Sequence, residues 1–85
     1  MTRDVQDLLS PAQARVYNLL YRHGDVKITT LFRALKHRPP EPRETNRIQQ
    51  QFISVYITRA NRRLAERGLK IAPGGARGTY RLYHR

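Results

Sequence analysis

The longest regular pattern of hydrophobic positions in this chain lies between Asn46 and Gly68. Apolar residues recur there at helical spacing, and at 100° per residue they fall on one narrow stripe. The stripe consists of Ile53, Ile57, Ala60 and Leu64. Asn46, followed three residues later by Gln49, is a capping signal, and Gly68 is a typical helix terminator. The pattern therefore predicts one long helix with this stripe buried.

The opposite face of the predicted helix combines amide, hydroxyl, methyl and guanidinium groups. It consists of Gln51, Val55, Thr58, Arg59 and Arg62. A solvated helix normally includes acidic residues on such a face, because charge pairs four residues apart stabilise it. In this helix an acid occurs only at Glu66, in the last turn. The composition favours a helix that lies in the major groove of DNA, and a merely solvated basic face is the alternative.

A shorter amphipathic helix is predicted from Ser10 to Gly24. Ser10 is a preferred N-cap, and Pro11 is a preferred first helical residue. Its apolar positions, at i, i+4, i+7 and i+8, are Ala12, Val16, Leu19 and Leu20. Residues 26–28 alternate apolar and polar, which predicts a short strand.

A second short helix is predicted next, capped by Thr29 or Thr30. It must end before Arg38, because the two prolines that follow exclude the helical conformation. Residues 38–45, RPPEPRET, then form a stiff polar connection. This connection serves either as a spacer or as a contact point for a partner.

The C-terminal part predicts a β-hairpin. Residues 69–72 and 79–83 both alternate in strand fashion. The glycines of residues 73–78 permit the positive-φ positions of a hairpin turn, and Arg77 lies in its tip. The predicted order is helix, short strand, helix, long helix, two-stranded hairpin. The predicted fold class is mainly α with a small β-hairpin (α+β).

The totals narrow the class of protein. The chain has 85 residues and no cysteine, so we expect one small domain without disulfides. We expect a flexible lead-in at residues 1–8 and the domain at residues 9–83. No apolar run is long enough to span a bilayer, and the N-terminus has no signal-peptide pattern. We therefore expect a soluble, cytoplasmic and nucleoid-associated protein.

Positive charge dominates the chain. The net charge is +11, from 17 basic and 6 acidic residues. Residues 43–85 contain 10 basic and 2 acidic residues, so most of the excess lies in the second half. Such a balance predicts a polyanionic partner that is bound through phosphate contacts. Most of the basic residues are arginine, which suits bidentate contact to phosphate or guanine.

Three motifs lie along the chain in the order of a known family. Leu9-Ser10-Pro11, with Leu19-Leu20 and Gly24, is similar to a start pattern L-[ST]-P…LL…G. Residues 55–64, VYITRANRRL, are similar to V-x-I-[ST]-R-L-R-x-K-L. Residues 77–82, RGTYRL, are similar to R-G-x-G-Y-R-L. Together these motifs resemble the winged helix-turn-helix of OmpR/PhoB-type effector domains, over residues 9–83.

The chain departs from this family in three ways. The family's phosphate-accepting receiver domain and the small sheet before the first helix are not found in the sequence. Ala60 stands where the family usually has leucine, and the wing lacks the glycine that normally precedes its tyrosine. The resemblance therefore implies a DNA-binding surface but no control by phosphorylation.

The resemblance implies that the helix at residues 46–67 lies in the major groove and the wing at residues 69–83 lies at the minor groove or backbone. Gln51 and Arg62 suit adenine and guanine edges, and the methyl groups of Val55 and Thr58 suit thymine. Arg77 is expected to reach the DNA from the wing. The phosphate candidates on the helix are Arg47, Arg59, Arg63 and Arg67.

Other chemistry is not indicated. Phe52 and Tyr56 flank the buried stripe, and we expect them to pack against the first helix or the wing, with base stacking as the alternative. The three histidines lie far apart and have no neighbouring cysteine or carboxylate pattern, so no metal site is predicted. No nucleophile–base pair, carboxylate pair or cofactor motif is present, so we expect no enzyme and no cofactor.

The sequence thus predicts sequence-specific binding of double-stranded DNA by a small winged-helix transcription regulator, of the kind expected in a phage or mobile element. One alternative is an architectural DNA-binding factor such as an excisionase. A second is a protein-interaction module that docks on an acidic partner such as RNA polymerase. Small domains seldom supply high specificity alone, so dimers or tandem copies on DNA are expected. Neither a membrane nor a small-molecule substrate is expected as a partner.

Overall fold

The structure is a computed structural model that describes residues 7–84. It is mainly helical with a small three-stranded antiparallel sheet, which confirms the predicted fold class at this level. The elements are α2 (Pro11–His23), β1 (Val26–Lys27), α3 (Ile28–Lys36), α4 (Asn46–Leu64), the 3-10 helix η1 (Ala65–Arg67), β2 (Leu69–Pro73) and β3 (Thr79–His84). Most of the lead-in predicted at residues 1–8 lies outside the described residues.

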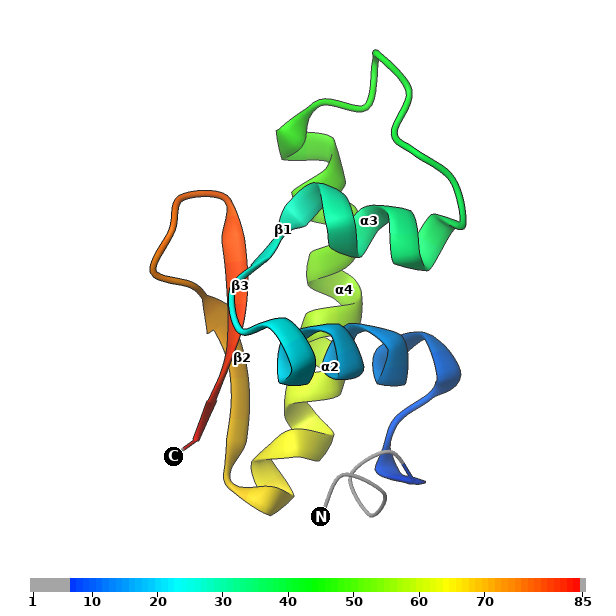
Figure 1. The fold of residues 1–85 in the computed structure, drawn as a ribbon. Coiled ribbons are helices and arrows are strands. Elements are labelled where there is room, and N and C mark those ends of the chain that lie inside the picture. The colour runs from blue at the N-terminus through cyan, green and yellow to red at the C-terminus, as the bar shows by residue number, and fades with distance from the viewer. Residues whose placement is uncertain (1–6, 85) are drawn as a thin grey trace.

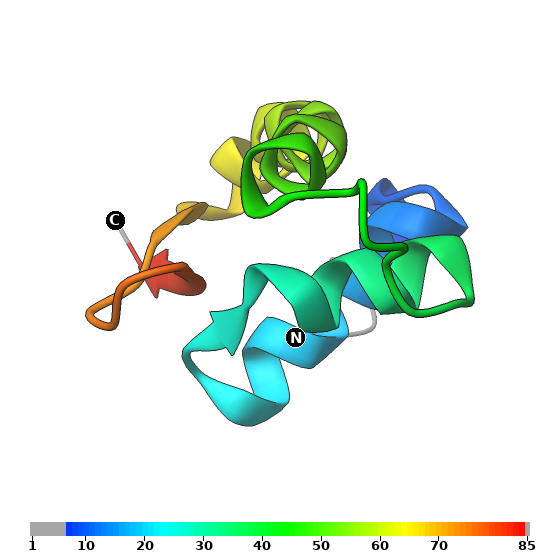
Figure 2. The same cartoon turned by 90° about the horizontal axis from the view of Figure 1, so that it is seen from above.

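The long helix α4 runs the length of the molecule, and α2 and α3 cross it on one side (Figure 1). Figure 2 views α4 nearly end-on and shows the β2–β3 hairpin beside it. The side of α4 away from α2 and α3 remains exposed, as at Val55, whose relative exposure is 48%. The fold therefore presents one face of its longest helix to solvent.

The start and end of α2 are as predicted. The Ser10 side chain accepts a hydrogen bond from the Gln13 amide, and the Gln13 side chain accepts one from the Ser10 amide, both at 3.2 Å. Gly24 closes the helix with a positive φ of 76°. The predicted apolar stripe is correct at Val16 and Leu20, which are buried. Tyr17 is also buried, at 3% exposure, so the core-facing side is wider than the one predicted.

The predicted cap of α3 is wrong. The helix begins at Ile28, and its N-cap Lys27 makes no side-chain cap bond. The strand predicted at residues 26–28 is therefore one residue shorter, because Ile28 belongs to the helix. Thr29 and Thr30 both lie inside the helix and do not cap it, and the Thr29 hydroxyl donates to Gln49 Oε1 at 3.1 Å. The helix ends at Lys36, before Arg38 as predicted.

The predicted capping box of α4 is also wrong. Thr45 is the N-cap, and its side chain accepts a bond from the Ile48 amide at 3.4 Å. Gln49 has 5% exposure and turns inward, where its amide donates to the Glu44 carbonyl at 2.7 Å. A side chain turned toward Thr29 in this way is not available to cap its own helix.

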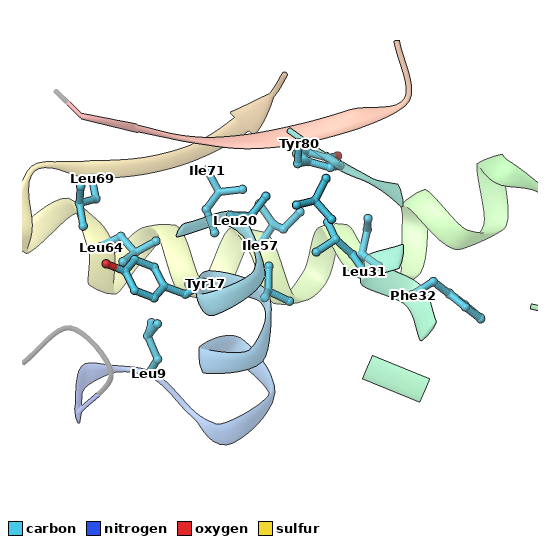
Figure 3. Packing of buried hydrophobic residues seen from close by; sticks show 14 residues of the cluster. Leu9, Tyr17, Leu20, Leu31, Phe32, Ile57, Leu64, Leu69, Ile71 and Tyr80 are labelled. Atoms are coloured by element: carbon cyan, nitrogen blue, oxygen red, sulfur yellow. The ribbon is translucent and has the colours of Figure 1, made fainter. Parts of the chain in front are cut away.

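The predicted buried stripe of α4 is confirmed. Ile53, Ala60 and Leu64 have 0% exposure and Ile57 has 6%. The α-helix ends at Leu64, one turn earlier than predicted, and η1 continues the chain to Gly68, which has a positive φ of 70°. Figure 3 shows side chains of the helices and the sheet meeting in this core, among them Leu20, Ile57 and Ile71.

The sheet contains one strand more than the predicted hairpin. Its order is β1-β3-β2, with Val26 opposite Tyr80 and Ile71 opposite Leu82. The outer strand β2 is fixed to α4 by Asn61. The Asn61 amide nitrogen donates to the Ile71 carbonyl at 2.9 Å, and the Ile71 amide donates to Asn61 Oδ1 at 2.7 Å. One side chain therefore satisfies both backbone groups at the edge of the sheet.

The hairpin turn uses its glycines in a different way from the one predicted. Within residues 73–78 only Gly78 has a positive φ, of 74°. Gly74 is required for close approach instead, because a Cβ there would lie 2.6 Å from Thr79 Oγ1 and 2.7 Å from Asp25 Oδ1. The backbone amide of Ile28 donates to the Gly78 carbonyl at 3.0 Å, which fixes the turn to the start of α3.

We predict that Asn61→Ala lowers the free energy of unfolding by about 1–3 kcal/mol, because it leaves the Ile71 amide and carbonyl unpaired. Asn46→Ala is the matched control. Asn46 lies in the same helix, is exposed and is not the N-cap, so its loss should change stability by less than about 0.5 kcal/mol. Urea unfolding followed by circular dichroism compares the two. A loss near 1 kcal/mol for Asn46→Ala would restore the original capping assignment.

Candidate nucleic-acid interface

All of the residues predicted to contact DNA are exposed. They are Arg47, Gln51, Val55, Thr58, Arg59, Arg62, Arg63, Arg67 and Arg77. Arg47 lies in the first turn of α4, and Arg67 is the last residue of η1. The two are 20 residues apart, which corresponds to about 30 Å of helix. The structure therefore does not gather the nine residues at one point. It distributes them along α4 and adds the hairpin at one end.

A groove of about 640 Å³ lies between the N-terminal ends of α3 and α4 and the hairpin turn. Asn46 and Gln50 line it from α4, Lys27 from β1, and Arg77 from the turn. The predicted wing residue Arg77 thus shares one groove with the first turns of α4. Sequence reasoning missed Lys27, Asn46 and Gln50. Gln50 points toward the hairpin side of α4, and only the position of the hairpin reveals this.

A second groove, of about 320 Å³, lies between the start of α2 and the C-terminal half of α4. Arg59, Arg62 and Arg63 line it, together with Ser10 and Gln13 of the capping box. Three guanidinium groups thus gather beside the N-terminal end of α2, where the helix dipole is also positive. Arg62, the predicted guanine contact, lies with the two predicted phosphate contacts.

Asp25, Glu41 and Glu44 are engaged in ion pairs. Three ion pairs occur among residues 7–84: Arg38 with Glu44 at 2.7 Å, Arg43 with Glu41 at 3.5 Å, and Arg81 with Asp25 at 3.6 Å. None of them includes an arginine from the predicted interface. The positive charge along the outward face of α4 is therefore not neutralised by these carboxylates.

The connection between α3 and α4 is held by one of these pairs. Arg38 binds Glu44 in a bidentate manner, at 2.7 and 2.9 Å, and Glu44 also accepts the backbone amide of Glu41 at 2.8 Å. The hydrogen bond from Arg38, and then that from Glu41, lower the pKa of Glu44 to about 2. These contacts order the proline-rich segment immediately before α4.

Phe52 packs against a different element from the one predicted. The Phe52 ring lies 5.5 Å from that of Phe32 on α3, in edge contact, and 5.3 Å from that of Tyr56. Lys36 places its Nζ 4.5 Å from the Phe52 ring centre. The predicted neighbours were the first helix and the wing, so the assignment of Phe52 is corrected to α3, whereas the Tyr56 ring contacts Phe52 within α4. A ring held in this way between α3 and α4 is a structural contact of the two helices.

Residues 7–84 contain no group of three or more His, Cys, Asp or Glu side chains placed to hold a metal ion. Among the same residues, no helix has the length and hydropathy needed to cross a membrane.

Comparison of the chain with protein-family models, with curated proteins and with solved structures gives no match. Function is therefore inferred from the residues of this surface and their surroundings.

A pH dependence of stability follows from Glu44. Its pKa is lowered from 4.5 to about 2, so the Arg38–Glu44 pair stabilises the fold above about pH 4.5, and this contribution is lost as the pH falls through about 2. We predict that Glu44→Gln loses less stability than the wild type between pH 5 and pH 2 in urea unfolding. Glu66→Gln, at an exposed carboxylate outside the three pairs, should lose as much as the wild type. Equal losses in all three proteins would contradict a role for the pair.

Proposed function

We propose that the chain is a winged-helix domain that binds double-stranded DNA with sequence preference and regulates transcription. In this proposal α4 lies in the major groove and the β2–β3 hairpin is the wing, which reaches the adjacent minor groove or backbone. The observation that carries the proposal is the outward face of α4. It exposes amide, methyl and guanidinium groups over its full length without a carboxylate.

The two grooves support different roles for the two halves of α4. Its N-terminal half exposes amides and methyl groups, at Gln50, Gln51 and Val55, which suit base edges. Its C-terminal half gathers three guanidinium groups, which suit phosphates. The bases would thus be contacted near the wing and the backbone near the start of α2. We propose no catalytic activity and no cofactor for this surface.

Selection of bound duplexes from a random pool tests the proposal. Affinity for the selected duplex is then measured by fluorescence anisotropy as a function of salt. We predict a log–log slope of magnitude about 4 to 7, corresponding to a similar number of neutralised phosphates. A slope near zero, or tighter binding to single strands of the same sequence, would overturn it.

A bending assay on the selected duplex separates this proposal from an architectural role. An excisionase-like factor bends the duplex cooperatively over several sites, so bending that requires several bound copies would favour the architectural role.

We predict that Arg62→Ala weakens binding to the selected duplex by about 1–3 kcal/mol. If Arg62 contacts guanine, as the sequence indicates, the loss will be confined to one or two base pairs. If it acts with its neighbours in the second groove, the loss will be uniform across sequences. Arg63→Ala is the matched control, because the sequence assigns it to phosphate alone. Unchanged affinity for both variants would remove the C-terminal half of α4 from the interface.

We predict that Arg77→Ala weakens binding most when the flanks of the site are A·T-rich, because narrow minor grooves attract arginine. The melting temperature should remain nearly unchanged, because Arg77 is exposed and belongs to none of the three ion pairs. The measurement is affinity for one core site with A·T-rich and with G·C-rich flanks. Equal losses would make Arg77 a phosphate contact, and no loss would show that the hairpin does not touch DNA.

A further inference from the structure

Two aliphatic side chains are exposed on α4. Among the described residues, the large hydrophobic side chains with high exposure are Tyr21, Ile48, Val55 and Tyr83. The two tyrosines carry a hydroxyl group that water can bind, and they lie on α2 and β3. Ile48 and Val55 carry no polar atom and are 46% and 48% exposed. An aliphatic surface of this kind on a strongly basic face indicates a contact that includes an apolar group.

Ile48 and Val55 form one short strip. They are seven residues apart, so they point in nearly the same direction and lie about 10.5 Å apart along the helix axis. Gln51 lies between them, and Arg47 and Arg59 flank them. Val55 was expected on the DNA-facing side, but the exposure of Ile48 is a finding of the structure.

Pairing of two copies through this strip is opposed by charge. The next position at seven-residue spacing is Arg62, which is exposed. Parallel pairing of two α4 helices would bring Arg62 of each copy together, and antiparallel pairing would place Arg62 on Ile48. The surrounding arginines favour a polyanion that also carries apolar groups.

The major groove of DNA meets this description. Thymine alone among the standard bases presents an apolar group there, its C5-methyl. The same methyl occurs on 5-methylcytosine. We propose that Ile48 and Val55 recognise the C5-methyl groups of two pyrimidines in the bound site. At 3.4 Å per base pair, their spacing corresponds to pyrimidines about three base pairs apart. This inference rests on the proposed function and assigns two base positions to named residues.

The test replaces each thymine of the selected duplex, one at a time, by deoxyuridine, which removes the methyl and nothing else. Anisotropy should show losses of about fourfold, the equivalent of one buried methyl group, at two positions about three base pairs apart. In Ile48→Ala, replacement of thymine by deoxyuridine at one of these positions should no longer change the affinity. In Val55→Ala, the same should hold at the other position. Tyr21→Ala, at an exposed aromatic residue outside α4, should remain as sensitive as the wild type at both.

A second set of duplexes distinguishes the methyl from the rest of the base. At each sensitive position the thymine pair is replaced by a cytosine pair or by a 5-methylcytosine pair, and the methylated form should bind about fourfold more tightly. Equal affinity for cytosine and 5-methylcytosine would overturn the assignment to the methyl. Melting curves confirm that the two alanine variants remain folded.

The outcomes separate this inference from the proposed function. If deoxyuridine is tolerated everywhere while Arg62→Ala still weakens binding, DNA binding stands and methyl recognition is wrong. Losses at deoxyuridine that persist in both alanine variants also overturn the assignment. If no duplex is retained from the random pool, the proposed function itself fails, and the methyl contact with it.

Discussion

The rotation of α4 about its own axis determines everything else on this surface. Each helical residue advances the direction of the side chain by 100°, so a rotation of one position would exchange core residues for solvent-facing ones. The fully buried side chains of Ile53, Ala60 and Leu64 exclude such a rotation. Burying one side chain the size of leucine or isoleucine contributes about 1.5–3 kcal/mol. The outward face is therefore as firmly defined as the core.

Two amide side chains, the buried Gln49 and the half-buried Asn61, also fix the orientation of α4. Gln49 joins the start of α4 to Thr29 on α3, and Asn61 joins its later turns to the edge strand β2. Each of these two amides makes two hydrogen bonds. The bonds fix the position of α4 relative to its neighbours in a way that the apolar stripe alone does not. Through Asn61 the position of the hairpin depends on α4, and the bond between Ile28 and Gly78 fixes its tip to α3. These contacts are what bring Arg77 to the groove at the beginning of α4.

Much of this was predictable from the sequence, and the errors have a common cause. The N-cap of α2 at Ser10 and the buried stripe of α4 are local patterns, and they were predicted correctly. The roles of Gln49 and Phe52 depend on residues of α3 that lie 20 positions away, and the role of Gly74 depends in part on Asp25, 49 positions away beside β1. Gln49, for example, has the spacing of a capping residue, but Thr29 competes successfully for its side chain.

The candidate interface could likewise be predicted only where it depends on local sequence patterns. Which residues of α4 face solvent was readable from periodicity, because the buried stripe defines its opposite. The grouping of Arg59, Arg62 and Arg63 beside the start of α2 was not, since Ser10 lies 49 residues earlier. The groove that Arg77 shares with Gln50 could not be predicted from the sequence either. Sequence patterns identify the exposed face, and tertiary packing decides which of its residues act together.

The central claim is that the outward face of α4 contacts duplex DNA. The most direct measurement is a titration of the isotopically labelled protein with the selected duplex, followed by NMR chemical shifts of backbone amides, side-chain amides and methyl groups. We predict the largest changes at Gln51, Val55 and Ile48, with smaller ones at Gly78 beside the tip of the hairpin. Changes confined to residues 38–45 or to the outer sides of α2 and α3, with α4 unaffected, would contradict it.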